Sequence, residues 1–504
     1  MLLILGILFV TCCILLWALS SPFYWKSKGV PYLFPLPLFG SYLTSFLLSN
    51  KDFYAKLYKN YPNEKYFGLH FYTRPALLIR DPSIMKDIFM KDFEYFTSNG
   101  LYSNFDNDPF GENLLFLHGQ EWKKLRLKLT RQFTPSKLRL MNDYVENIMK
   151  NATDFINKSI KQNEPIEIVK MNTNIATDVI VQAVYGIETD CFEDKSLFSS
   201  LGMKMFSPKT NTNMLFGTVS PKLNDFLKVN IFEKDVTEFV ENVMKDVIEY
   251  REKNQFNKKD FLDAMINVMK TNENNNKNEI YFPDKTRVPE YTFKTALAQA
   301  LLLISAGSES VAMAMSFFLY EISLNQEIQD KCREEIMAVV NETGTDIRYE
   351  DINKLTYLDM TIKETVRKHP LFVILFRKCT KRYQFRNSNL TIEPGTLLLA
   401  PVRSIQWDPN NYPDPESFIP ERFSNENKAS IDAGAYLPFG LGPRTCLGKY
   451  FARLEMLLVI SRLLRNYRFT MSSKTEVPVK VCKYTRIVTP NPGIWLNVEP
   501  INQF

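Results

Sequence analysis

The chain has 504 residues, of which 45% are hydrophobic and 13% aromatic, and its formal net charge is +6. The length by itself suits two or more domains. The charge is too small for a chain of this size to indicate a nucleic-acid-binding protein. Three histidines argue against a multi-histidine metal site. Seven cysteines without paired spacing argue against a disulfide framework and suit a reducing compartment.

The N-terminal segment, residues 1–25, is expected to be a membrane anchor. Residues 2–19 are almost wholly apolar, which matches the roughly 20 residues that a helix needs to cross a bilayer. The alternative is a cleaved signal peptide, which would have a basic start and a small-residue cleavage site. No charged residue precedes Lys26, and Lys26 and Lys28 follow the apolar run. The positive-inside rule therefore places the rest of the chain in the cytosol.

A proline-rich connector is expected over residues 26–40, because prolines at 31, 35 and 37 stiffen and extend the backbone. Next, the pattern predicts a helix from about Tyr54 and small strands over 66–79. A long loop rich in Asn, Gly and Asp is predicted over 97–120, followed by helices from near Glu121 and over 137–160. A further exposed loop is predicted at 272–278.

The longest predicted helix runs from Phe293 to Leu324. It is apolar on nearly every side over 297–306, which is typical of a helix buried in a core. Its middle nevertheless carries Gly307, Glu309 and Ser310. Polar groups are costly in an apolar interior unless they are paired or serve a function, so this segment is a candidate functional site.

Glu364 and Arg367 lie three residues apart on a predicted helix that ends before Pro370. Residues at this spacing share a helical face, so an ion pair is expected. Most such pairs are solvated surface contacts, and the pair alone does not indicate a functional role.

Near the C-terminus, Cys446 lies in a glycine-rich loop directly before a predicted helix over 449–464. A thiol at the start of a helix faces unpaired N–H groups and the positive end of the dipole, and both favour the thiolate. Gly442 and Gly448 permit a tight loop against which a flat ring can lie. Cys446 is therefore a candidate fifth ligand for haem iron. The alternative for Cys446 taken alone is a buried free thiol, which is the usual role of an isolated cysteine.

The pattern Phe439-x-x-Gly442-x-Arg444-x-Cys446-x-Gly448 matches all five fixed positions of the cytochrome P450 signature. The chain resembles this family of haem-thiolate monooxygenases over about residues 30–500. Residues 113–122 and 132–134 are similar to the animal microsomal branch, which includes insect detoxification enzymes and liver drug oxidases. The resemblance implies a mainly α fold with a small β-rich part, with the haem between the long central helix and the cysteine-ligand loop. It also implies one catalytic domain over residues 41–504.

The resemblance assigns roles to individual residues. It implies that Cys446 is the axial thiolate ligand of haem b. The residues that it assigns to cofactor binding are Trp122, Arg126, Arg377, Phe439, Gly440, Arg444 and Gly448. The residues that it assigns to oxygen activation and proton relay are Ala306, Gly307, Glu309 and Ser310. The residues that it assigns to a buried network bracing the cysteine loop are Glu364, Arg367 and Arg422.

The chain departs from the family pattern at two positions. Ser310 replaces the usual threonine; it keeps a hydroxyl for a proton relay but loses the methyl group that restricts the rotamer. The alternative role for Ser310 is a hydrogen bond back to its own helix. Gln406 stands where many relatives have histidine, and we expect little functional consequence from this difference.

The resemblance implies a monooxygenase that inserts one atom of O2 into a lipophilic small molecule. Its electrons would come from NADPH through an NADPH-cytochrome reductase, with cytochrome b5 as a second candidate donor, at the endoplasmic reticulum membrane. Basic residues at 123, 124, 128 and 131 would suit an acidic electron donor, although solvated helix charges explain them almost as well. Two alternatives remain: a haem-thiolate isomerase or dehydratase, and a non-catalytic haem protein that binds lipophilic ligands.

Overall fold

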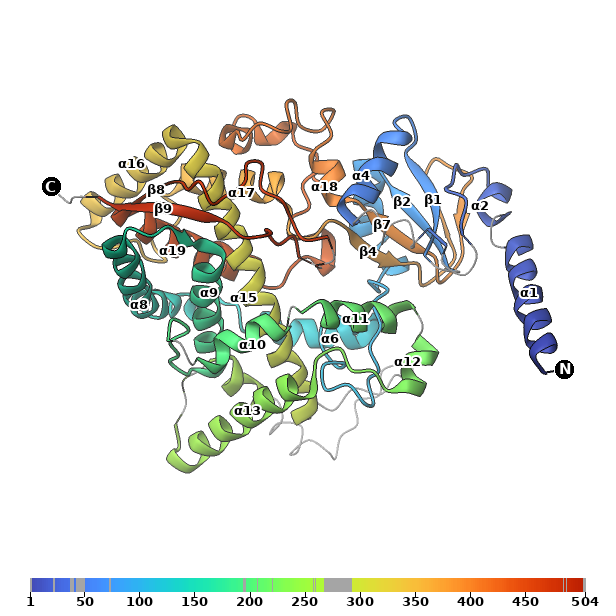
Figure 1. Cartoon of the computed structure of the whole chain (residues 1–504), viewed down its shortest axis with the longest axis horizontal. Coiled ribbons are helices and arrows are strands. Elements are labelled where there is room, and N and C mark those ends of the chain that lie inside the picture. The colour runs from blue at the N-terminus through green and yellow to red at the C-terminus, as the bar shows by residue number, and fades with distance from the viewer. Residues whose placement is uncertain are drawn as a thin grey trace.

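The computed structural model describes residues 2–20, 23–36, 40–41, 50–71, 74–193, 196–205, 207–219, 221–256, 258, 260–266, 292–483, 485 and 487–501. The loop predicted at 272–278 lies outside the described residues. Most of the described chain is helical, which confirms the prediction of a mainly α fold (Figure 1).

The longest helix, α15 (Phe293–Leu324), has the bounds predicted from the sequence. It begins where the Thr292 side chain accepts a hydrogen bond from the Thr295 N–H, a standard helix cap. It packs against α9 (Ile168–Tyr185), α17 (Thr356–Lys368) and α19 (Lys449–Asn466), and runs through the middle of the helical part (Figure 1). In the described part of the chain, α15 is long and apolar enough to cross a membrane by length and composition, but 67% of its most apolar stretch is buried inside the protein. The predicted core helix is therefore present.

The remaining helices surround this core. Those before α15 are α4 (Asn50–Asn60), α5 (Pro82–Lys86), α6 (Gly119–Thr130), α7 (Pro135–Leu138), α8 (Met141–Gln162), α10 (Leu197–Met205), α11 (Pro208–Val219), α12 (Pro221–Leu227) and α13 (Lys234–Asn254). Those after it include α16 (Gln326–Thr343) and α18 (Val402–Gln406). The loop predicted over 97–120 is irregular as far as His118, and α6 begins at the next residue, Gly119.

The β-rich part is built on a four-stranded sheet in the order β1-β2-β7-β4. β2 (Arg74–Ile79) pairs in parallel with β7 (Leu397–Ala400), and the outer strands β1 (Tyr66–Phe71) and β4 (Leu375–Lys378) are antiparallel to them. β7 is wholly buried, as expected for a central strand with both faces covered. Smaller sheets join β3 (Ile166–Glu167), β9 (Trp495–Pro500) and β8 (Tyr467–Met471), and pair β5 (Tyr383–Gln384) with β6 (Thr391–Ile392).

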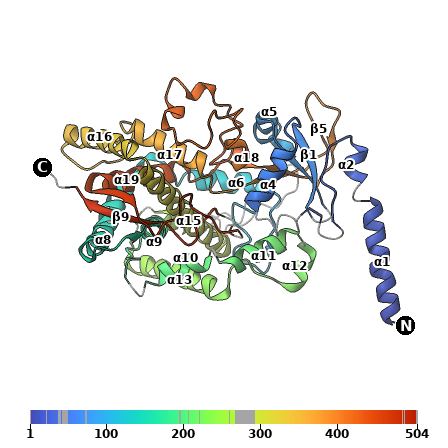
Figure 2. The ribbon, with the colours of Figure 1, turned by 45° about the horizontal axis from the view of Figure 1, so that its top comes forward.

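Two hydrophobic clusters correspond to these two parts. The larger joins the helices around α15, and the smaller joins the four-stranded sheet to α4 and to the segment around Phe89. In Figures 1 and 2 the sheet lies on the side of the N-terminus, and α8, α16 and α19 lie on the opposite side.

The N-terminal residues form α1 (Leu2–Ser20) and the short helix α2 (Phe23–Ser27). Trp25, which the sequence analysis included in the anchor, is fully buried, and its indole N–H donates to the Leu69 carbonyl at 2.8 Å. Its ring occupies the space where a Cβ on Gly68 would lie, at 2.4 Å. Tyr32 also pairs with Gly68, so this part of the connector is packed onto the sheet and is not a free spacer.

Candidate functional site

The loop that carries Cys446 is shaped by backbone hydrogen bonds before α19 begins. The Gly440 N–H donates to the Leu437 carbonyl at 3.1 Å, and the Cys446 N–H donates to the Phe439 carbonyl at 2.8 Å. Gly442 has a φ of +72°, and a Cβ there would lie 1.8 Å from the Phe89 carbonyl oxygen. Only glycine fits at this position, because a side chain would clash with the neighbouring backbone.

Cys446 keeps accessible surface, but the protein atoms around it partly exclude water from the thiolate, and this desolvation raises the pKa of the thiol. Three groups act in the opposite direction: the Gly448 N–H and the cations of Arg126 and Lys449. The sequence predicted the groups that lower the pKa of this thiol but not the effect of desolvation. Without a metal, desolvation outweighs those groups, and the net pKa is raised. The thiol form is therefore favoured before a metal binds. Metal binding would release its proton, because the thiolate is the ligand form.

Three arginines from distant segments converge near this loop: Arg126 of α6, Arg377 of β4 and Arg444. Burial, followed by repulsion from the other two cations, lowers the pKa of Arg444 to about 9. Burial lowers the pKa of Arg377 to about 10, and its Nε has no hydrogen-bond partner among the described residues. Within the residues that the structure describes, none of these three arginines forms an ion pair with a carboxylate.

The protein holds these cations with neutral groups. Arg126 donates to the Thr445 carbonyl at 2.8 Å, and the Arg444 Nε donates to the Thr97 carbonyl at 2.6 Å. A second Arg444 nitrogen donates to the Leu117 carbonyl. The Trp122 ring lies 4.5 Å from the Arg444 guanidinium, close enough for a cation–π contact. The cluster is therefore fixed in place while its positive charge remains uncompensated.

This arrangement fits a flat, dianionic cofactor such as haem. Buried cations without counterions are costly, and two propionate carboxylates would supply the missing charge and hydrogen-bond acceptors. Apart from the adjacent residues of the chain, no atom of the described residues lies within 4 Å of a Cβ built on Gly448, and the nearest to one on Gly440 is Thr445 Cα at 3.9 Å, so there is room for a ring at the loop. Cys446 and Ala306 are both exposed, and Ala306 is so although Ile304, Ser305, Ser308 and Glu309 around it on α15 are buried.

The four predicted residues of α15 have different environments. Ala306 and Ser310 lie four residues apart on one helix face and are accessible, whereas Glu309 is buried. Gly307 faces α9, where a Cβ would lie 2.7 Å from the Ile180 side chain, so glycine allows close packing of the two helices. The Ser310 hydroxyl donates to the Ala306 carbonyl at 2.6 Å. This is the back-bonded arrangement that the sequence left open as the alternative.

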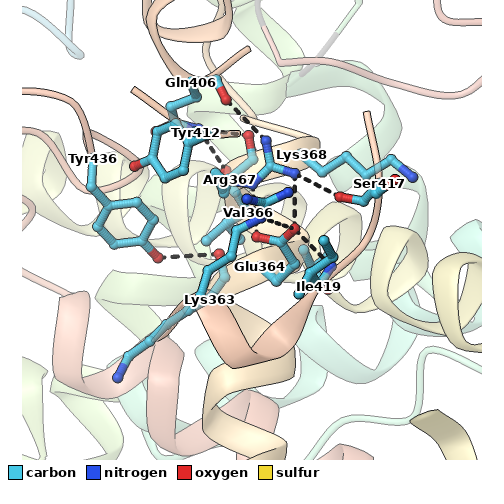
Figure 3. Close-up of polar contacts among 12 residues, drawn as sticks. Lys363, Glu364, Val366, Arg367, Lys368, Gln406, Tyr412, Ser417, Ile419 and Tyr436 are labelled. Carbon is cyan, nitrogen blue, oxygen red and sulfur yellow. Dashed lines mark hydrogen bonds and ion pairs between the residues drawn. The ribbon is translucent and has the colours of Figure 1, made fainter. Parts of the chain in front are cut away.

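The structure brings Glu364, Arg367 and Arg422 together. Arg367 donates to both oxygens of Glu364, from Nε to Oε2 at 2.7 Å and from Nη2 to Oε1 at 2.8 Å (Figure 3). The Ile419 N–H also donates to Oε1 at 3.0 Å, and Arg422 lies 3.4 Å from it. The side chains of Glu364 and Arg367 are fully buried. All of these groups are paired, as a buried ionic network requires.

Gln406 is a member of this network that sequence reasoning did not single out for a role. It is fully buried, and its carboxamide nitrogen donates to carbonyls of α17 (Figure 3). Its oxygen accepts from the Leu437 N–H in the segment before the cysteine loop. The family pattern marks Gln406 only as a replacement for histidine, and it does not indicate that this neutral side chain connects two segments. The burial of Gln406 depends on packing between distant segments, so the sequence carries no local signal of this role.

Removal of one cation tests whether the arginine cluster binds an anion. Arg377→Met should leave the melting temperature of the haem-free protein unchanged or raise it, because an uncompensated buried charge is removed. Haem binding should weaken by roughly tenfold to a hundredfold, the loss expected for one charge-assisted hydrogen bond. The measurement is haem transfer to an excess of acceptor protein, with the exposed Arg382→Met as matched control. Unchanged haem retention in Arg377→Met would contradict this role.

Comparisons with known proteins agree with this geometry. A family model described as "Cytochrome P450" matches residues 30–498. "Probable cytochrome P450 6a14" of Drosophila melanogaster is 33% identical over 488 residues, which cover 95% of each chain. "Cytochrome P450 6k1" of Blattella germanica is 33% identical over 483 residues, covering 94% of this chain and 92% of that protein.

Proposed function

Because the chain belongs to the cytochrome P450 family of haem-thiolate monooxygenases, we propose that it inserts one atom of O2 into a lipophilic small molecule with electrons from NADPH. Haem would supply the oxygen chemistry, and Cys446 is the thiolate that we assign to its iron. The observation that carries the assignment is the accessible Cys446 beside Arg126, Arg377 and Arg444, of which Arg377 is buried and the other two are partly buried. Among the described residues, none of the three makes an ion pair with a carboxylate.

From the resemblance to the family, we propose that the loop after residue 100, the part of α15 around Leu302 and the segment near Val488 line a substrate pocket that suits an apolar ligand. Phe105, Leu302, Leu303 and Val488 are partly buried at the edge of the main hydrophobic cluster, so each leaves some apolar surface accessible. The Tyr102 hydroxyl donates to Asp225 at 2.6 Å, and the Ile231 N–H donates to Asp108 at 3.1 Å. These bonds hold the loop that follows residue 100 against the segment around α12.

Ser310 is proposed to relay protons by rotating away from the Ala306 carbonyl, because a hydroxyl can donate to only one partner at a time. Ser310→Ala should lower the ratio of product formed to NADPH consumed by at least about tenfold, since a positioned proton donor is lost. Ser310→Thr keeps the hydroxyl and should keep the ratio. The measurement is NADPH consumption and product in the same reaction. Equal ratios in the native protein and Ser310→Ala would contradict the relay.

The electron donor is proposed to dock at the face formed by α6 and the start of α19. Lys123 and Leu127 of α6 and Arg131 directly after it are exposed, as are Lys449 and Tyr450. The hydrogen bond from Arg126 to the Thr445 carbonyl joins α6 to the cysteine loop, so this basic face lies next to Cys446. A positive face with exposed apolar side chains suits an acidic protein partner such as a flavin-containing reductase or cytochrome b5.

The chain is proposed to be anchored in the endoplasmic reticulum membrane by α1, with the catalytic domain in the cytosol. α1 is a 19-residue helix without charged side chains, and Ile7, Leu8 and Phe9 are exposed. A second exposed apolar group lies on α12, where Phe226 is 81% exposed beside Leu223 and Leu227. Figures 1 and 2 both place α12 at the edge of the molecule nearest α1, which suits contact with one membrane surface.

The test of the proposed function is reconstitution of the full-length protein with reductase, NADPH and O2, followed by a screen of lipophilic compounds. Products containing one atom from labelled O2, formed only with NADPH, are expected. Rearrangement of an organic peroxide without NADPH would identify an isomerase or dehydratase instead. Ligand binding without any product across the screen would indicate a non-catalytic haem protein.

A further inference from the structure

Gln406 is the last residue of α18 and is fully buried between α17 and the segment that leads to the cysteine loop. Its carboxamide bears no charge, so it can be buried at lower cost than a carboxylate, provided that its donors and acceptor are paired. Gln406 forms hydrogen bonds with both α17 and the segment that leads to the cysteine loop.

On one side, the amide nitrogen of Gln406 caps the C-terminal end of α17. It donates to the Arg367 carbonyl at 2.8 Å and to the Val366 carbonyl at 3.1 Å. The indole N–H of Trp407 donates to the next carbonyl, that of Lys368, at 2.8 Å. The last carbonyls of a helix have no partner within the helix, and these two side chains supply partners for three of them.

On the other side, the amide oxygen of Gln406 accepts from the Leu437 N–H at 3.0 Å. The Leu437 carbonyl in turn accepts from the Gly440 N–H, which closes the turn that precedes the cysteine. Phe439, inside this turn, accepts from the Cys446 N–H at 2.8 Å. One side chain therefore connects the end of α17 with the turn whose backbone holds Cys446.

The backbone of Gln406 also contacts the buried ion pair. The Gln406 carbonyl oxygen accepts from Arg367 Nη1 at 2.9 Å (Figure 3). The guanidinium of Arg367 is therefore held by Glu364 and by the Gln406 backbone, and the carbonyl of Arg367 is held by the Gln406 side chain. The position of α17 and the position of the cysteine loop are thus set by the same residue.

We propose that Gln406 is a positioning residue that fixes the Cys446 loop relative to α17 and so keeps the sulfur aligned with the iron. The proposal rests on the assignment of Cys446 as the haem ligand. A carboxamide is suited to this place because it donates to two carbonyls and accepts from one N–H without carrying charge. A hydrocarbon side chain would leave all three backbone groups unpaired in the interior.

The test uses the full-length protein in membranes with four variants: Gln406→Asn, Gln406→Leu, Gln406→His and the control Trp407→Phe. The Asn side chain is one carbon too short to reach both sides, and Leu has no polar group. A neutral His offers one donor and one acceptor nitrogen and should restore the link. Trp407→Phe removes the bond to Lys368, keeps an aromatic ring beside Arg403, and leaves the bond to Leu437 untouched. Two quantities are measured: the melting temperature, and the share of haem with a strongly red-shifted Soret band in the carbon monoxide difference spectrum.

Gln406→Asn and Gln406→Leu should lose most of the red-shifted band in favour of an ordinary haem band, and Gln406→His should retain it. Trp407→Phe should lower the melting temperature without changing the band. The proposal is overturned if Gln406→Asn lowers the melting temperature as Trp407→Phe does and keeps the native band. If Gln406→Leu does not fold, the proposal is tested by comparing the red-shifted bands of Gln406→Asn and Gln406→His. If the native protein itself lacks the red-shifted band, the assignment of Cys446 fails and this proposal falls with it.

Discussion

Glu364→Gln is expected to remove about 3–5 kcal/mol from the free energy of unfolding, because it leaves the buried Arg367 cation without its counterion. The amide that replaces Oε2 would also face Arg367 Nε, a donor, at the 2.7 Å where the carboxylate now accepts. A domain is stable by only about 5–15 kcal/mol, so the loss is a large part of the total. The variant should give little folded protein at 37 °C, and denaturant unfolding of the recovered fraction measures the loss.

The matched control is Glu342→Gln, the same chemical change at an exposed ion pair. Glu342 accepts from Lys354 at 2.7 Å, but both side chains are well exposed to solvent. Exposed pairs contribute little to stability, so this variant should unfold at the native denaturant concentration. If both glutamine variants unfold at that concentration, the buried network does not support the fold in the way its geometry indicates.

Cys446→Ser is expected to abolish product formation while leaving the protein folded. Serine is close to cysteine in size, so the change in stability should stay below about 1.5 kcal/mol. The alcohol is a much poorer ligand than a thiolate and lacks the electron donation that favours cleavage of the O–O bond. Turnover in the reconstituted system should fall to background, and the melting temperature of the haem-free variant should match that of the native haem-free protein.

The same change at Cys482 is the control for this variant. Cys482 is partly exposed and lies on the segment after β8, where its N–H donates to the Thr489 carbonyl. Cys482→Ser should keep native turnover. Substantial product formation by Cys446→Ser would show that another group holds the iron, and the assignment of the loop would then be wrong.

Elements with strong local signals could be predicted from the sequence. The bounds of α15 follow from a long apolar pattern after a capping threonine, and α19 begins at the expected Lys449. Local pattern also places the short strands β1 and β2. These features depend on residues close together in the chain, where propensity and periodicity carry the information.

Contacts between distant segments could not be predicted in this way. Arg377 meets Arg444 and Arg126 only because β4, the cysteine loop and α6 converge, and the sequence suggested this through family resemblance alone. The residues next to Trp25 and Gly307 in the sequence do not indicate that Trp25 fills the space beside Gly68 or that Gly307 packs against Ile180. Such contacts depend on the whole fold, and periodicity within one element does not contain them.

Side-chain hydrogen bonds were the least predictable feature. The hydroxyl of Ser310 had two plausible partners, and the structure shows the bond to Ala306. We expected little consequence from Gln406, yet it is fully buried with partners on two segments. The choice between a surface and a buried role depends on packing, which a single sequence does not specify.

The carbon monoxide difference spectrum of the reduced, full-length protein in membranes tests the central claim most directly. Cys446→Ser is the comparison, prepared in the same way. A strongly red-shifted Soret band in the native protein and its loss in Cys446→Ser are predicted, because only a thiolate ligand gives this shift. An ordinary haem band in the native protein, or a red-shifted band that survives in Cys446→Ser, would contradict the assignment of Cys446 as the haem ligand.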